Sequence, residues 1–365
     1  MIDQRDVERA SEHFRPPDGS FERLMLRRDR KRRDRRIRAG AVGLAIAIAL
    51  GWVGVDAFQS APPGPLDDPT PSPSEDLGIF EPVAGRIVYG DRDGIWGLDP
   101  TGPADPAAAV RLTPETGTPL AWSSDGTRLL ISRGDLDEQR LFVLHADGSE
   151  TQVTDPPMVM RNGATISPDG SLVVFHGGPA TPRGTCCDLY AVDADGGPAE
   201  LLLEVPGVVQ EPTFSPDGTR IAYVIGSGDH SHSVWVMNAD GTDAHQILAN
   251  ETTQGAGHVY GLAWSPADDL IAIGIEGATY TFATDGSGFT EVIAGGDRPY
   301  WSPDGSQLAY TGACLEDLDG CGLGVADTDG PSMRMFDFAA SGPWHPAAAG
   351  ESDEPIVSAT PDIQE

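Results

Sequence analysis

Residues 301–310 read Trp301-Ser302-Pro303-Asp304-Gly305-Ser306-Gln307-Leu308-Ala309-Tyr310, and variants of this phrase recur along the 365-residue chain. Proline presets φ for a tight turn, Asp bonds the turn backbone, and Gly accepts a left-handed conformation. An apolar run follows most of the turns and predicts a buried strand. The copies begin at aromatic or large apolar residues 37 to 50 residues apart: Trp122, Ile166, Phe214, Trp264, Trp301 and Trp344. Self-similarity at this period is typical of β-propeller blades.

A second half completes each unit, with a strand followed by an Asp-Gly turn, as in residues 141–148, 189–196 and 234–241. The first unit, residues 86–99, has this second half without the opening phrase, and the last unit, residues 342–346, has only the opening. Five complete units and two complementary fragments predict an all-β, six-bladed propeller over residues 85–346, whose ends share one blade. In the fifth blade Asp268 replaces the glycine, and we expect a left-handed conformation there because Asp tolerates one.

These repeats resemble those of the TolB-like six-bladed propellers, which centre on the same Trp-Ser-Pro-Asp-Gly and Asp-Ala-Asp-Gly phrases. The resemblance covers roughly residues 85 to 346 and rests on five copies in register with their Asp-Gly partners. It implies a protein of the cell envelope that acts mostly through binding. Related propellers also accompany peptidase domains.

The formal charge of −32 is divided unevenly along the chain. Residues 1–38 carry 13 basic and 8 acidic side chains, whereas the remainder carries 11 basic and 48 acidic ones. Residues 39–55 then form 17 consecutive uncharged positions. As a helix they span about 25 Å, close to the roughly 30 Å hydrocarbon core. The pattern predicts a single transmembrane helix over residues 39–58, with the basic arm cytoplasmic and the propeller outside the cytoplasm.

A cleaved secretory signal is the alternative interpretation of this segment, because Val55-Asp56-Ala57 would be an acceptable cleavage site. The 38 residues before the apolar stretch are long for a signal peptide, which favours an uncleaved anchor in the cell membrane. The chain is therefore divided into a basic arm (1–38), an anchor (39–58), a proline-rich linker (59–84), the propeller (85–346) and an acidic tail predicted to be disordered (347–365).

All four cysteines follow the predicted anchor, on the side where disulfides persist. Cys314 and Cys321 bracket six residues of a hairpin in blade six, and we predict a disulfide between them. Cys186 and Cys187 are adjacent, so a bond between them would be a vicinal disulfide, and both the bonded and the free state stay open. Pairing with Cys314 or Cys321 is not expected, because the two sets belong to opposite blades. No Cys-x-x-Cys or neighbouring His pair completes a zinc site.

Histidines supply the weak candidates for a metal site. His230 and His232 lie in a Gly/Ser-rich loop and His258 follows in the next connection, so the three could line one mouth of the channel. A solvated loop explains the same residues, and His345 is expected to pack at the closure. The Asp-x-Asp-Gly strings fit turns better than calcium loops, and no Gly-x-Ser-x-Gly elbow occurs. The sequence thus predicts no catalytic residue and no cofactor.

The function expected from these features is binding. Trp122, Phe214, Trp264 and Trp301 should pack between blades, which leaves the variable connections to form the rims: 133–140, 177–188, 226–233, 250–258 and 312–322. The acidic propeller argues against nucleic acid. We expect a monomeric, membrane-anchored, extracytoplasmic propeller that binds a protein, peptide or cell-envelope ligand without catalysis. A hydrolase or lyase with a site at the channel mouth, and a sensor signalling to the cytoplasmic arm, are the alternatives.

Overall fold

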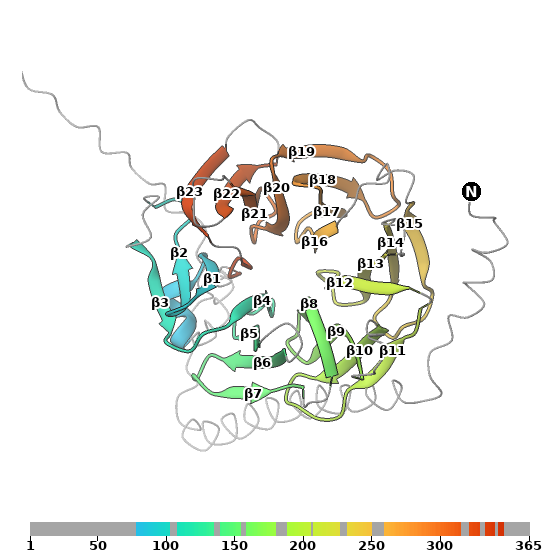
Figure 1. Ribbon diagram of the computed structural model, residues 1–365, viewed down its shortest axis with the longest axis horizontal. Coiled ribbons are helices and arrows are strands. Elements are labelled where there is room, and N and C mark those ends of the chain that lie inside the picture. The colour runs from blue at the N-terminus through green and yellow to red at the C-terminus, as the bar shows by residue number, and fades with distance from the viewer. Residues whose placement is uncertain are drawn as a thin grey trace, which may run out of the picture.

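The repeats fold into six β-sheets arranged around a central axis, which confirms the predicted six-bladed propeller (Figure 1). Blades 2 to 6 each have four antiparallel strands in chain order, with the first strand innermost, and blade 1 has three strands. The computed structural model describes residues 78–102, 108–134, 139–154, 158–179, 188–205, 207–226, 232–249, 259–314, 321–328, 333–339 and 342–346.

The strands of each blade follow one another along the chain. Blade 1 contains β1 (Ile87–Asp91), β2 (Gly94–Leu98) and β3 (Val110–Thr113). Blade 2 contains β4 (Thr118–Trp122), β5 (Arg128–Arg133), β6 (Arg140–His145) and β7 (Glu150–Gln152). Blade 3 contains β8 (Met158–Ile166), β9 (Leu172–Pro179), β10 (Asp188–Asp193) and β11 (Glu200–Leu203). Blade 4 contains β12 (Val208–Phe214), β13 (Arg220–Gly226), β14 (His232–Asn238) and β15 (His245–Leu248). Blade 5 contains β16 (Val259–Trp264), β17 (Leu270–Ile275), β18 (Ala278–Ala283) and β19 (Thr290–Ala294). Blade 6 contains β20 (Gly296–Trp301), β21 (Gln307–Cys314), β22 (Cys321–Asp327) and β23 (Met333–Ala339).

The Ser-Pro-Asp-Gly phrase forms the turn between the first two strands of a blade. In blade 4 the Ser215 hydroxyl donates to Asp217 Oδ1 at 2.6 Å and accepts from the Arg220 amide at 2.9 Å. Gly218 has a φ of +68°, which costs glycine nothing. The same Ser–Asp bond recurs in blades 2, 3 and 6, at Ser123–Asp125, Ser167–Asp169 and Ser302–Asp304. The phrase is therefore explained by turn chemistry, as predicted.

Blade 5 departs from this pattern. Asp268 is not among the described residues with positive φ, so the expected left-handed conformation is wrong at this position. The physical reason is that Ala267 stands in place of the turn aspartate and cannot close the turn. Ser265 Oγ instead accepts from the Ala267 and Asp268 amides at 3.3 and 3.1 Å, which holds a wider bend.

Both hairpin turns of a blade lie on one side of the propeller, here named the turn face. In blade 2 the Ala146 amide, in the second turn, donates to the Thr127 carbonyl of the first turn at 3.0 Å. Equivalent bonds join the two turns of blades 3 to 6: Ala194 to Ser171, Ala239 to Thr219, Thr284 to Asp269 and Thr328 to Ser306. The strand ends that flank the long connections therefore lie on the opposite side.

Apolar side chains of neighbouring blades pack together and form the core. Phe214, at the end of β12, packs with Val174 and Leu189 of blade 3 and Tyr223 of its own blade. Trp264 packs in the same way with residues of blade 4, and Trp301 with residues of blade 5. The expectation that these aromatic residues pack between blades is confirmed.

The ring closes where the first and last segments of the propeller meet, as the complementary half-units predict. Trp344 pairs antiparallel with Ile87 of β1. The Val88 amide donates to the Pro343 carbonyl at 3.0 Å, and the His345 amide donates to the Arg86 carbonyl at 2.8 Å. Residues 343–345 thus supply the inner edge that blade 1 lacks.

A 3₁₀ helix, η1 (Gly78–Val83), covers this closure from the turn face. Phe80 and Val83 are fully buried, and the Ile79 amide donates to the Ala146 carbonyl at 2.8 Å. Residues 78–83 were expected in the linker; they belong instead to the folded propeller, because their apolar side chains complete the core under blades 1 and 2. No helix among the described residues is long and apolar enough to cross a membrane. The predicted arm (1–38), anchor (39–58) and tail (347–365) lie outside the described residues.

His345 packs at the closure, as expected, and is completely buried. Its ring contacts Trp122 edge to face, with centroids 4.4 Å apart, and its Nε2 donates to the Gly126 carbonyl at 3.2 Å. Burial lowers the pKa of His345, although the bonds to backbone and the charge of Asp125 oppose this effect. Protonation is therefore less favourable in the folded chain than in the unfolded chain.

We expect this histidine to make the closure sensitive to acid. Because the folded-state pKa lies below the unfolded value of about 6.5, the unfolded chain binds more protons as the pH falls through that value. Stability is then lost below about pH 6.5, by at most about 1.4 kcal/mol per pH unit for one proton. Thermal unfolding of the chain and of His345→Gln between pH 5 and 7.5 measures this. A smaller pH dependence in the variant is expected, and an unchanged dependence would remove His345 as the cause.

Candidate functional site

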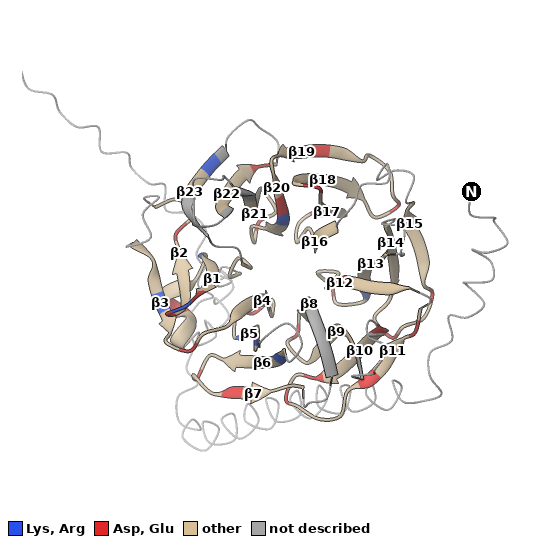
Figure 2. Ribbon diagram, in the orientation of Figure 1, with Lys and Arg blue, Asp and Glu red and all other residues tan. Residues whose placement is uncertain are grey.

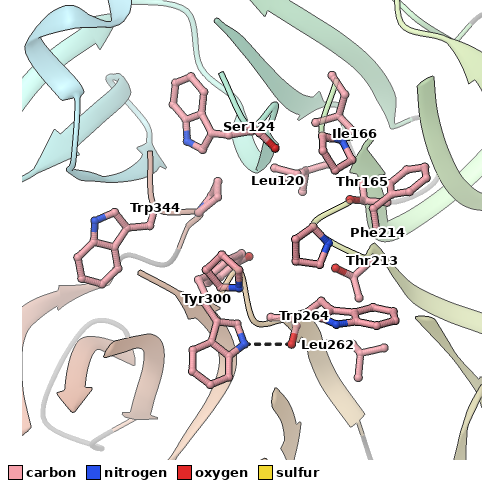
Figure 3. A pocket seen from close by; sticks show the side chains of 18 of the residues that line it. Leu120, Ser124, Thr165, Ile166, Thr213, Phe214, Leu262, Trp264, Tyr300 and Trp344 are labelled. Atoms are coloured by element: carbon pink, nitrogen blue, oxygen red, sulfur yellow. Dashed lines mark hydrogen bonds between the residues drawn. The ribbon is translucent and has the colours of Figure 1, made fainter. Parts of the chain in front are cut away.

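A pocket of about 300 Å³ lies at the centre of the ring, where the innermost segments of all six blades converge (Figure 3). Figure 3 shows Ser124, Thr165, Thr213 and Leu262 around the opening, with Tyr300 and Trp344 on its other side. The described residues that form the walls are all at repeat positions: residues 120–124, 163–166, 168, 211–216, 261–264, 266, 299–303, 343, 344 and 346. A cavity built by every blade is the kind of concave site that binding proteins use.

The pocket lies in the half of the channel next to the turn face. Each inner strand runs toward its Ser-Pro turn, and the residue two positions after the aromatic or apolar anchor lies at the rim. Proline occupies this position in five blades and Ser124 in the other: Pro168, Pro216, Pro266, Pro303 and Pro346. The rim is consequently rigid and carries no backbone donor at those five points.

The deepest wall of the pocket is formed three positions before the anchors. Blades 4, 5 and 6 have Glu211, Gly261 and Arg298 at this position, with φ values of +49°, +82° and +51°. Glu211 and Gly261 line the pocket, whereas Arg298 lies behind its wall. The strand register shifts at each of these points, so all three residues lie in bulges. A side-chain carbon on Gly261 would lie 2.8 Å from the Arg298 Cα. Glycine therefore lets the strands of blades 5 and 6 approach closely between two charged residues.

Glu211 is the only carboxylate among the described residues that line this pocket. Its side chain accepts a hydrogen bond from the Gly261 amide of the next blade. Burial among the inner strands raises the pKa of Glu211 to about 7, while Arg298 and the Gly261 amide act in the opposite direction. A carboxyl group with such a pKa changes its charge near neutral pH.

Two further side chains interact electrostatically with Glu211: Tyr300, through its hydroxyl group, and Arg298, through its guanidinium. Burial and the charge of Glu211 raise the pKa of Tyr300 to about 12, so its hydroxyl stays protonated. The Arg298 guanidinium lies over the Tyr260 ring at 5.9 Å and does not line the pocket. Within the described part of the chain, no ion pair of 4.0 Å or less joins Arg298 to Glu211.

Acidic residues greatly outnumber basic ones in the propeller (Figure 2), and many of them lie in the hairpin turns of the turn face. Hydrogen bonds from Ser215 and Thr219 hold the pKa of Asp217 below its usual range, and Ser302 does the same for Asp304. The hairpin turns of blades 2 to 6 carry these aspartates: Asp125, Asp147, Asp169, Asp193, Asp195, Asp217, Asp240, Asp243, Asp268, Asp269, Asp285, Asp304 and Asp327. Arg128 and Arg220, which begin strands there, pair with Asp195 at 2.9 Å and Asp269 at 3.5 Å. The face keeps a large excess of negative charge.

The histidine and cysteine candidates from the sequence are not among the described residues that line the pocket. His232 begins β14 opposite Gly226 and is buried, so a solvated loop is wrong for this residue. The other two histidines, His230 and His258, lie outside the described residues, as do Cys186 and Cys187. No group of three or more His, Cys, Asp or Glu that could hold a metal ion occurs in the described ranges.

The backbones of Cys314 and Cys321 are paired directly across the ladder of β21 and β22. Directly opposed residues of an antiparallel pair have Cα atoms about 4.5–5.5 Å apart, a separation that suits a disulfide. The bond itself stays a prediction.

Comparison with known proteins identifies the fold. No protein-family model matches the chain. TolB from Acinetobacter baumannii superposes with a TM-score of 0.57 and 15% identity, over 72% of this chain and 67% of that one. A TolB candidate from Agrobacterium tumefaciens gives 0.51 and 21%, over 64% and 86% of the two chains. This chain has the TolB propeller fold.

A sequence relative extends the comparison without adding a function. An uncharacterized protein of Agrobacterium fabrum (strain C58 / ATCC 33970) is 24% identical over 210 residues, which cover 52% of this chain and 67% of that protein. At these identities the likeness to the TolB structures concerns the fold. What the pocket binds has to be argued from its own residues.

Proposed function

We propose that this protein is a membrane-anchored, extracytoplasmic propeller that binds a protein, peptide or cell-envelope ligand at the turn-face end of its channel, without catalysis. The observation that carries the proposal is the pocket of about 300 Å³, which every blade helps to line. Its rigid proline rim and aromatic walls suit an inserted side chain or chain segment. The location rests on the basic flank and the uncharged stretch of residues 39–55.

The chain path supports a tethered arrangement. Residues 78 and 346 both lie at the turn face, since Ile79 bonds to Ala146 and Pro346 lies beside Gly126. The proline-rich segment 59–77 would therefore join the propeller on the face that carries the pocket. At about 3.1 Å per residue, 19 extended residues reach roughly 60 Å, which leaves room for a partner between membrane and pocket.

Filling the pocket tests the proposal. Thr213 lines the pocket, whereas Thr290 is exposed on the outer strand β19. The full chain in detergent, used as bait with an extract of its own cell envelope, should capture a partner that Thr213→Trp no longer captures. Thr290→Trp, the matched control, should capture it as before. Equal capture by both variants would contradict binding at this pocket.

A second comparison separates the two ends of the channel. Replacing the connections 226–233 and 250–258 with Gly-Ser turns alters the opposite side and leaves the pocket intact. If this variant loses capture while Thr213→Trp keeps it, the binding site lies on the variable connections, as the sequence predicts.

A hydrolase or lyase is the second candidate, and one observation favours it. Glu211 lines a cavity and has a pKa near 7, a value suited to a general acid or base. Turnover of a peptide, glycan or lactone that is lost in Glu211→Gln, with folding unchanged, would establish the enzyme and displace the binding proposal.

A further inference from the structure

Glu211 distinguishes this pocket from a simple apolar channel. The described walls are otherwise built of prolines, hydroxyl groups, and aliphatic and aromatic side chains, with this single carboxylate at the deepest level. The carboxylate is fixed by the Gly261 amide, which satisfies one of its several acceptor positions. The remaining positions are available to a donor that enters from the turn face.

We propose that the pocket is selective for a cationic group, the ammonium or guanidinium of a Lys or Arg side chain in a polypeptide partner, and that Glu211 determines this selectivity. The inference deepens the proposed binding function and rests on it. A basic side chain fits such a site in two parts, because its alkyl stem packs on apolar walls while its charged end reaches a carboxylate.

The negative charge of the turn face also favours a cationic ligand. The turn-face aspartates surround the rim, and the nearby arginines Arg128 and Arg220 are already paired with Asp195 and Asp269. A negative mouth raises the local concentration of cations and speeds their association. An anionic ligand would be repelled at the rim and would then meet a carboxylate at the pocket floor.

The close neighbours of Glu211 leave the pocket side of the carboxylate to the ligand. Arg298 extends over the Tyr260 ring and does not line the pocket, so it tunes Glu211 without occupying the ligand position. Tyr300 presents a neutral hydroxyl, and His176 lies behind Gly163, where a side-chain carbon on that glycine would meet its ring at 2.3 Å. A bound cation would favour the ionised form of Glu211.

Two capped tripeptides that differ in one charge form the probe: acetyl-Ala-Lys-Ala-amide and its norleucine counterpart. Affinities are measured by tryptophan fluorescence on the full chain in detergent micelles, at constant ionic strength. We expect at least a tenfold preference for the lysine peptide, which Glu211→Gln abolishes. Glutamine can still accept the Gly261 bond, so the floor of the pocket is kept.

Asp243→Asn is the matched control, because it also removes one negative charge, but from a turn of blade 4 that does not line the pocket. Asp243 has a φ of +57°, a conformation that asparagine also tolerates. This variant should keep the lysine preference within about twofold. For the unmodified chain, the affinity for the lysine peptide should rise as the pH passes upward through about 7, since burial raises the pKa of Glu211 to that value.

The outcomes separate this inference from the proposed function. Equal affinity for the two peptides, no binding of the lysine peptide, or an equal loss in Asp243→Asn would overturn the cation selectivity. If the Thr213→Trp variant still fails to capture the partner in that case, binding at the pocket stands and only its chemistry is different. If capture does not depend on the pocket at all, the proposed function fails as well.

Discussion

Deletion of residues 342–365 should lower the free energy of unfolding by roughly 4 kcal/mol or more. It removes the Trp344 side chain and the pairing of residue 344 with Ile87. It also removes the bond from Trp344 Nε1 to the Gly85 carbonyl at 2.9 Å, and takes His345 out of the cluster with Trp122 and Phe80. Blade 1 would keep three strands and an open inner edge, which leaves backbone groups unpaired.

Urea unfolding followed by tryptophan fluorescence measures this effect. The matched control is deletion of residues 347–365 alone, which leaves the pairing of residues 343–345 in place and should leave the midpoint unchanged. Equal midpoints for the two deletions would show that residues 343–346 do not close the ring. Some stability should survive the longer deletion, because Ile87, Leu98, Leu323 and Phe336 still pack between blades 1 and 6.

Gly261→Ala should destabilise the propeller by roughly 2–5 kcal/mol. Two energetic costs add at this position: the left-handed backbone conformation and the steric crowding of the added carbon. The residue has a φ of +82°, and its added carbon would lie 2.8 Å from the Arg298 Cα and 3.2 Å from Pro299 Cδ. Backbone atoms cannot give way as a flexible side chain can, so the inner strands of blades 5 and 6 would move apart. The Gly261 amide would then shift relative to the Glu211 carboxylate, and lysine-peptide binding should weaken.

Gly277→Ala separates the two costs. Gly277 has a φ of +78°, close to that of Gly261, but a carbon added there meets nothing within 4 Å. This variant should lose only about 1–2 kcal/mol, the cost of the left-handed conformation. Chemical unfolding of both variants gives the difference, and equal losses would mean that close strand approach at Gly261 contributes nothing.

The propeller architecture could be predicted from the sequence because it depends on local interactions, namely turn hydrogen bonds and apolar strand patterns. Each Ser-Pro-Asp-Gly turn is stabilised by contacts within a few residues, such as Ser215 with Asp217 and Arg220. The apolar runs that follow have the length and pattern of buried strands, as in β13 and β17. Counting complementary half-units then led to six blades and to closure between Ile87 and Trp344.

The candidate site was missed, although a signal for it exists. Glu211 stands just before a repeat phrase and matches no catalytic or metal motif, so motif spacing does not predict its role. Aligning the repeats on their anchors places Pro119, Gly163, Glu211, Gly261 and Arg298 at one position, where the two charged residues stand out. The sequence instead favoured the histidines of the variable connections, of which His232 lies buried in a strand.

The blades, their number and their turns could be predicted from the sequence alone, because these features depend on interactions between residues close together in the chain. The folded arrangement of the blades brings Glu211, Gly261 and Arg298, from three different blades, together at the channel. The same arrangement buries Glu211, which raises its pKa to about 7, and opens the pocket on the acidic turn face. Solvation and electrostatic energies depend on every atom around a group, and those atoms come from segments more than 80 residues apart.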